Sequence, residues 1–108
     1  MTGVLFLFLS AWFGPLQENP ERVYERVRPS VVAIRSLAVL GERSGTGVVI
    51  DRDGLILTSY SVVPRGAKDI RVWTTGPGLH RDVEIVGTSR KHEISLLRIR
   101  PKKPLVPI

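Results

Sequence analysis

The sequence predicts an all-β fold, a small six-stranded barrel with a short helix ahead of it. Two observations predict this class: the apolar residues fall in short runs, and turn-forming residues interrupt the chain at close intervals. With 43% hydrophobic and 24% charged residues, the composition is that of a packed globular domain. Closing the sheet into a barrel would also remove the strand edges that promote aggregation.

A short helix is predicted over residues 20–27, after a linker over residues 15–19. Asn19 suits the N-cap position, and Pro20 suits the first helical turn because its missing N–H has no partner there. Pro29 ends the helix, since the residue before a proline is pushed out of helical geometry.

Six apolar runs are predicted to be strands: residues 31–34, 47–50, 55–58, 70–73, 83–86 and 94–99. The stretch Asp51-Arg52-Asp53-Gly54 predicts a tight hairpin, because aspartate tolerates turn geometry and glycine supplies a positive φ. Gly41, Gly66 and the stretch Gly76-Pro77-Gly78 predict the other main turns.

The N-terminus carries an apolar run over residues 4–13. This run is too short for a membrane-spanning helix, which needs about 20 residues, but long enough for the core of a signal peptide. We therefore expect residues 1–14 to be an apolar leader and the protein to be exported to the periplasm or cell envelope, with no stable membrane span. An apolar terminus that is disordered or packed against a partner protein is the alternative.

The charge and the metal-ligating residues limit the partners. The net charge of +6 raises the question of nucleic-acid binding. The densest basic run, residues 98–103, is however short and lacks interleaved aromatics, so we expect a solvated tail and no nucleic-acid partner.

No cysteine is present, which excludes disulfides and thiolate chemistry. Neither His80 nor His92 has a second histidine at ligand spacing, so we expect no metal and no cofactor.

Four consecutive stretches of the sequence carry a family resemblance. They are Val31-Val32-Ala33-Ile34, Gly45-Thr46-Gly47-Val48-Val49-Ile50-Asp51, Asp53-Gly54-Leu55-Ile56-Leu57-Thr58 and Glu93-Ile94-Ser95-Leu96-Leu97-Arg98-Ile99. In this order and spacing they resemble the first half of the HtrA/DegP-type serine proteases, trypsin-like enzymes of two β-barrels. The resemblance implies that residues 20–100 form the N-terminal barrel and residues 101–108 the connector between barrels. We expect the second barrel, which carries the catalytic serine of the family, to be absent.

The resemblance also assigns two positions of the catalytic triad. In the family a histidine after the third strand is the general base, and an aspartate before the last strand orients it; the matching residues here are Ser61 and Glu93. Imidazole, with a pKa near 6.5, can accept the nucleophile's proton at neutral pH, whereas an alcohol cannot. Glu93 keeps the charge of the aspartate. We therefore expect Ser61 and Glu93 to be degenerate base and acid positions, with no functional catalytic residue.

Neither histidine is expected to replace the missing base. His92 precedes Glu93, and neighbours on an extended chain point to opposite faces. His80 follows a turn and is expected in an exposed loop. Ser44-Gly45-Thr46-Gly47 is not a nucleophile loop either, because it matches the buried strand start of the family, where small residues allow close backbone approach.

The sequence thus predicts a serine endopeptidase homologue that does not hydrolyse peptides. Two alternatives stay open: a pseudoprotease that binds through an exposed inter-barrel face, and a truncated relic without a selected function. The expected partner is a polypeptide, whether a substrate, a partner protein, a second barrel or another copy of the chain.

Overall fold

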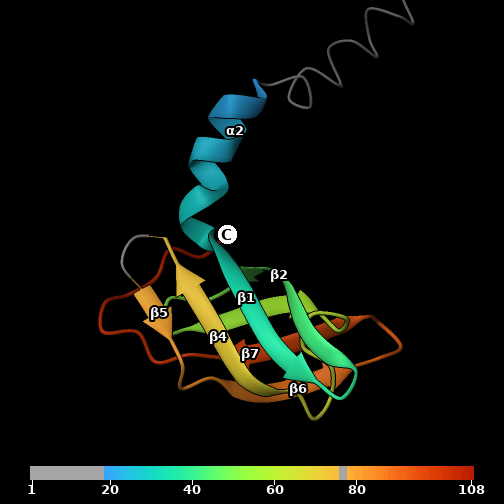
Figure 1. The fold of residues 1–108 in the computed structure, drawn as a ribbon. Coiled ribbons are helices and arrows are strands. Elements are labelled where there is room, and N and C mark those ends of the chain that lie inside the picture. The colour runs from blue at the N-terminus through green and yellow to red at the C-terminus, as the bar shows by residue number, and fades with distance from the viewer. Residues whose placement is uncertain (1–18, 76–77) are drawn as a thin grey trace, which may run out of the picture.

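The computed structural model describes residues 19–75 and 78–108, which form a single curled antiparallel sheet below a short helix (Figure 1). The helical elements are α2 (Pro20–Val27) and the 3-10 helix η2 (Arg28–Ser30). The strands are β1 (Val31–Ala38), β2 (Gly41–Val49), β3 (Leu55–Ser59), β4 (Lys68–Thr74), β5 (Gly78–His80), β6 (Glu84–Ser89) and β7 (Ile94–Arg98). The predicted all-β class with an N-terminal helix is confirmed.

The strand count differs from the prediction by one, because the sheet has seven strands in the order β5-β4-β1-β2-β3-β7-β6. The additional strand is β5, which pairs with β4 from Thr74↔Gly78 to Val72↔His80. Sequence patterns miss it because three residues are too few for an alternation to be recognised. No ladder joins β5 to β6 in the described part of the chain, so the curled sheet is a half-barrel with two edges.

Helix α2 begins and ends where the sequence predicts. The Asn19 side chain accepts a hydrogen bond from the backbone N–H of Glu21 at 2.9 Å, which satisfies one of the free donors of the first turn. Pro29 ends the α-helix within η2. In Figure 1 the helix extends away from the sheet, and none of its residues is fully buried.

The hairpin between β2 and β3 is built on Asp51. Its carboxylate accepts hydrogen bonds from the backbone N–H groups of Leu55 at 3.1 Å and Asp53 at 2.9 Å. The Leu55 bond is the largest cause that lowers the pKa of Asp51 below its ordinary value; desolvation, the next largest, opposes it, and Asp53, Arg98 and Gly54 lower the pKa further. Gly54 completes the turn with φ +114°, and a Cβ at this position would collide with the Ile99 carbonyl.

The core lies inside the curl of the sheet. Its buried hydrophobic residues are Val32, Ile34, Val49, Ile56, Val62, Val63, Ile70, Val72, Leu97 and Ile99. On β1 and β7 they alternate with exposed or half-buried residues, as a sheet with one covered face requires. Burying a side chain of this size contributes about 1.5–3 kcal/mol to stability, so these residues hold the half-barrel together.

Candidate active-site corner

Ser61 lies in the turn that follows β3, here called the Ser61 turn (residues 59–63). The backbone N–H groups of Val62 and Val63 both donate to the Ser59 carbonyl, at 3.0 and 3.2 Å, which closes one tight turn. The turn has two sides: Ser61 is exposed, whereas Val62 and Val63 point into the core and are 9% and 0% exposed.

Two buried serines hold the inner side of the turn. Ser36 Oγ on β1 donates to the Val62 carbonyl at 2.6 Å, and Ser95 Oγ on β7 donates to the Val63 carbonyl, also at 2.6 Å. An unpaired buried carbonyl costs about 1–3 kcal/mol, so each hydroxyl removes a substantial penalty.

Sequence reasoning assigned no role to these two serines, although a signal was present. Ser36 falls two residues after the buried Ile34, and Ser95 two residues before the buried Leu97, so both occupy core-facing positions of their strands. A hydroxyl in such a position needs a partner.

Gly45 allows the turn to pack closely on β2. A Cβ at Gly45 would lie 2.5 Å from Cγ2 of Val62, closer than side chains approach each other. The close approach predicted for residues 44–47 is therefore found at Gly45, but the stretch is not a buried strand start: it lies in the middle of β2, and Ser44 and Thr46 are exposed. Nearby, Thr58 Oγ1 donates to the Thr46 carbonyl at 2.8 Å and ties the end of β3 to β2.

The fold brings the two assigned triad positions to one corner. Strands β3 and β7 pair up to Ser59↔Ile94, and the backbone N–H of Tyr60 donates to the Glu93 carbonyl at 3.0 Å. Glu93 is thus the acceptor of this hydrogen bond, and Ser61 is the residue that follows its donor. Both residues are exposed, and Glu93 has a left-handed backbone with φ +57°.

The side-chain contacts at this corner provide no proton acceptor of the imidazole type. The Ser61 hydroxyl lies 2.8 Å from the Ser59 hydroxyl, and the Ser61 backbone N–H donates to Ser59 Oγ at 3.2 Å. Between Ser61 and Glu93 the described residues show no hydrogen bond. The corner therefore presents two linked alcohols beside the backbone of Glu93.

His92 is at the surface as expected, although for another reason, whereas His80 is not in an exposed loop. His92 occupies a turn rather than an extended chain, so the argument from alternating faces does not apply; its backbone N–H donates to Ser89 Oγ at 3.2 Å and its side chain is exposed. His80 belongs to strand β5 and is half-buried, not part of an exposed loop. Its pairing with Val72 of β4 is the reason for the difference.

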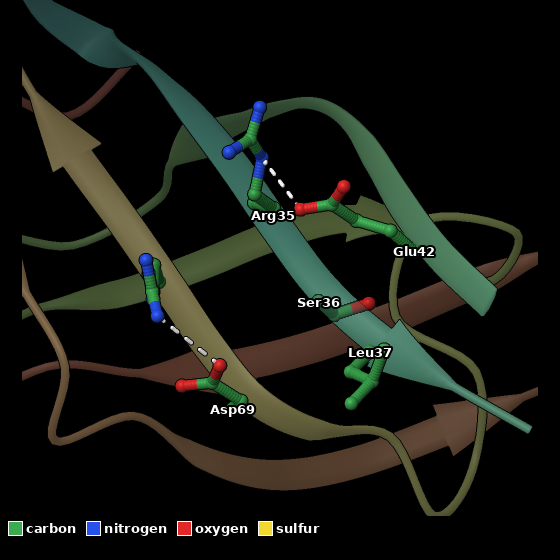
Figure 2. A pocket seen from close by; sticks show the side chains of 6 residues that line it. Arg35, Ser36, Leu37, Glu42 and Asp69 are labelled. Carbon is green, nitrogen blue, oxygen red and sulfur yellow. Dashed lines mark hydrogen bonds and ion pairs between the residues drawn. The ribbon is translucent and has the colours of Figure 1, made fainter.

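A small hollow of about 80 Å³ on the outer face of β1 and β4 is lined by charged residues (Figure 2). Two ion pairs occupy it: Arg35 with Glu42 at 3.1 Å and Arg71 with Asp69 at 3.2 Å. The four charges cancel, and the hydroxyl of Ser36, which also lines the hollow, is engaged with the Val62 carbonyl. We therefore interpret this hollow as a surface ion-pair site without chemistry of its own.

The described residues hold neither a metal-binding cluster nor a membrane-spanning helix. Residues 19–75 and 78–108 contain no group of three or more His, Cys, Asp or Glu side chains that could hold a metal ion. No helix in these same ranges has the length and apolarity needed to cross a membrane.

Comparison with known proteins identifies the family. Residues 45–108, which include both Ser61 and Glu93, match the family model of the trypsin-like peptidase domain. The chain belongs to the trypsin-like peptidase domain family. Its HtrA-type character is supported by two curated relatives.

Both relatives are proteases by name, and both are much longer than this chain. Protease Do-like 1, chloroplastic, from Arabidopsis thaliana is 37% identical over an alignment of 99 residues that covers 81% of this chain and 22% of that protein. Magnetosome formation protease MamE from Paramagnetospirillum magneticum is 36% identical over an alignment of 89 residues that covers 81% of this chain and 11% of that protein. The resemblance to HtrA/DegP-type proteases is thereby confirmed, for a segment that spans a small part of each relative.

Proposed function

We propose that residues 20–100 are the N-terminal barrel of an HtrA/DegP-type serine endopeptidase homologue that does not hydrolyse peptides. The observation that carries this proposal is the hydroxyl of Ser61 at the position of the general base. Its support is geometric: the hydrogen bond from Tyr60 to Glu93 sets the Ser61 turn beside Glu93, the arrangement that a base and its orienting acid require.

The chemistry at this corner explains why hydrolysis should be lost. A general base must take the nucleophile's proton and hold it as a stabilised cation, which a serine hydroxyl does not do near neutral pH. The inactivity rests on Ser61 itself and not on any segment outside the 108 residues.

Hydrolysis of fluorescently labelled casein tests the proposal, with the protein purified at the length its native source makes. We expect no fluorescence increase above the buffer blank from the wild type or from Ser61→Ala, while trypsin serves as the positive control. Ser44→Ala, a change at an exposed serine of β2, is the matched variant. Turnover by the wild type that persists in Ser61→Ala would contradict the proposal. Turnover lost in Ser61→Ala but kept in Ser44→Ala would contradict it too, since Ser61 would then take part in catalysis.

A pseudoprotease that binds a polypeptide is the second candidate. The tip of the β1–β2 hairpin favours it, because Val39 and Leu40 are 98% and 88% exposed, and large apolar side chains gathered on a surface mark interaction sites. Such a tip would engage a second copy of the chain or a partner protein. Sedimentation velocity of the wild type and of the Val39→Ser/Leu40→Ser variant tests self-association, which the variant should reduce. A wild type that is monomeric at every concentration would exclude self-association.

We further propose that the protein acts outside the cytoplasm, after export directed by residues 1–14. These residues lie outside the described part of the structure, so the proposal rests on their apolar sequence. The names of the relatives, one chloroplastic and one of the magnetosome, are compatible with an envelope setting. N-terminal sequencing of the protein from its native source tests it: a mature N-terminus after about residue 14 is expected, and a retained Met1 would contradict cleavage.

A further inference from the structure

A groove of about 690 Å³ lies between β5, the start of η2 and the segment over residues 100–106. Hydrogen bonds fix its walls. The backbone N–H of Leu105 donates to the Arg52 carbonyl at 3.0 Å, which anchors the C-terminal segment to the β2–β3 hairpin. Thr75 Oγ1 donates to the Arg28 carbonyl at 3.0 Å, which ties the end of β4 to η2. None of the groove residues belongs to the Ser61 turn.

The charge of the groove has one sign. Arg100, Lys102 and Lys103 line it, and no aspartate or glutamate among the described residues does. The hollow in Figure 2 differs in this respect, because there two carboxylates neutralise two guanidinium groups. Uncompensated cations in a groove attract an anionic occupant and speed its association.

The rest of the groove favours a polypeptide over a nucleic acid. Leu79 and Val106 line it and are 43% and 52% exposed, so the groove offers apolar contacts between its cations. Among the described residues no Phe, Tyr or Trp lines it, and His80 is its one aromatic ring, whereas single-stranded nucleic acids bind mainly by stacking successive bases on several such rings. Strand β5 is an edge of the sheet, with no partner on its outer side among the described residues.

We propose that this groove binds an extended, acidic polypeptide segment, which adds to the free edge of β5. Main-chain hydrogen bonds to β5 give register, as in other cases of strand addition. Because side chains alternate along a strand, a segment with alternating acidic and apolar residues directs its carboxylates to Arg100, Lys102 and Lys103 and its apolar side chains to Leu79 and Val106. The proposal does not rest on the proposed function, since it uses neither Ser61 nor Glu93.

Fluorescence anisotropy with a labelled Glu-Val-Glu-Val-Glu-Val-Glu peptide tests the charge complementarity. We expect binding by the wild type and at least about tenfold weaker binding by Lys102→Glu/Lys103→Glu. The matched control is Arg90→Glu/Lys91→Glu, which reverses two exposed cations in the turn before β7 and should bind as the wild type does. No binding by the wild type, or an equal loss in both double variants, would overturn the proposal.

Three further probes distinguish an acidic polypeptide from other occupants of the groove and test whether it binds by strand addition. A Lys-Val-Lys-Val-Lys-Val-Lys peptide should not bind, and a labelled oligothymidylate should bind more weakly than the acidic peptide. Tighter binding of the oligothymidylate would show a polyanion site and overturn the assignment to a polypeptide. An acidic peptide N-methylated at alternate residues should bind more weakly, because it lacks the donors that strand addition needs. Unchanged affinity would overturn strand addition to β5.

Discussion

The inner side of the Ser61 turn is held in place by several contacts with the core, whereas the outer side makes few contacts. On the inner side the carbonyls of Val62 and Val63 are bonded to buried serine hydroxyls at 2.6 Å, and the Val62 side chain packs against Gly45. On the outer side Ser61 and Glu93 are exposed and share no hydrogen bond in the described structure.

This difference separates the demands of the fold from the demands of catalysis. A change on the inner side leaves a buried carbonyl unpaired or a core side chain displaced, and therefore costs stability. The Ser61 side chain is exposed to solvent and hydrogen-bonds only to the Ser59 hydroxyl among the described side chains, so replacing it should cost little stability. The scaffold that would position a general base can thus persist when the base itself has been replaced.

Leu97→Ala is expected to cause the largest loss of stability, because Leu97 of β7 belongs to the core cluster that also contains Val62 and Val63. Leu97 is fully buried, and removing its side chain leaves a cavity that lowers the free energy of unfolding by about 2–5 kcal/mol. Urea unfolding followed by far-UV circular dichroism measures the loss. Leu37→Ala is the matched control, because Leu37 is 51% exposed and the same truncation there should cost less than about 1 kcal/mol. Equal losses would mean that Leu97 is not in the core.

A smaller loss is expected for Ser95→Ala, which removes the hydroxyl that the Val63 carbonyl accepts. The unpaired buried carbonyl should lower the free energy of unfolding by about 1–3 kcal/mol. Ser44→Ala and Ser61→Ala, at exposed serines, should each change it by less than about 0.5 kcal/mol. A loss in Ser61→Ala as large as that in Ser95→Ala would remove the contrast between the two sides of the turn.

The smallest effect is a pH dependence that belongs to the β2–β3 hairpin, away from the Ser61 turn. The hydrogen bond from the Leu55 backbone N–H is the main reason why the pKa of Asp51 is lowered in the folded state. Asp51 therefore binds a proton less readily in the folded protein than in the unfolded chain. Its contribution is complete above the unfolded pKa of about 3.9 and is lost as pH falls through the folded value.

Urea midpoints from about pH 7 down to about pH 3 would reveal this dependence. The advantage of the wild type over Asp51→Asn should shrink as pH falls below about 4. Asp82→Asn, at an exposed carboxylate outside the hairpin, is the control for the general effect of acid. An advantage over Asp51→Asn that stays constant across the range would contradict the role of the Asp51 charge.

Much of the fold follows from local signals in the sequence. Asn19 and Pro20 predict helix α2, and the stretch from Asp51 to Gly54 predicts the β2–β3 hairpin, because each signal acts within a few residues. Strand β5 and the turn around His92 are also closed by contacts near in sequence, but a strand of three residues carries too short an alternation to be recognised, and the residues of the His92 turn include no glycine or proline that would mark it.

The candidate site also contains residues that the sequence indicated and residues that only the structure revealed. The family resemblance pointed to Ser61 and Glu93, but the buried partners of the turn, Ser36 and Ser95, became visible only in the structure. Their hydroxyls meet carbonyls 26 and 32 residues away in the chain. Contacts of this sequence separation are set by the curl of the sheet, which the strand pattern alone does not determine.

The most direct test of the central claim, that Ser61 and Glu93 are the base and acid positions of one degenerate pair, is an NMR titration of the Ser61→His variant. A carboxylate nearby favours the charged imidazole, so the introduced side chain should titrate with a pKa above the ordinary value of about 6.5. Adding Glu93→Gln should lower that pKa, whereas adding Glu84→Gln, at an exposed acid of β6, should leave it unchanged. A pKa that is the same with and without the Glu93 carboxylate would contradict the account.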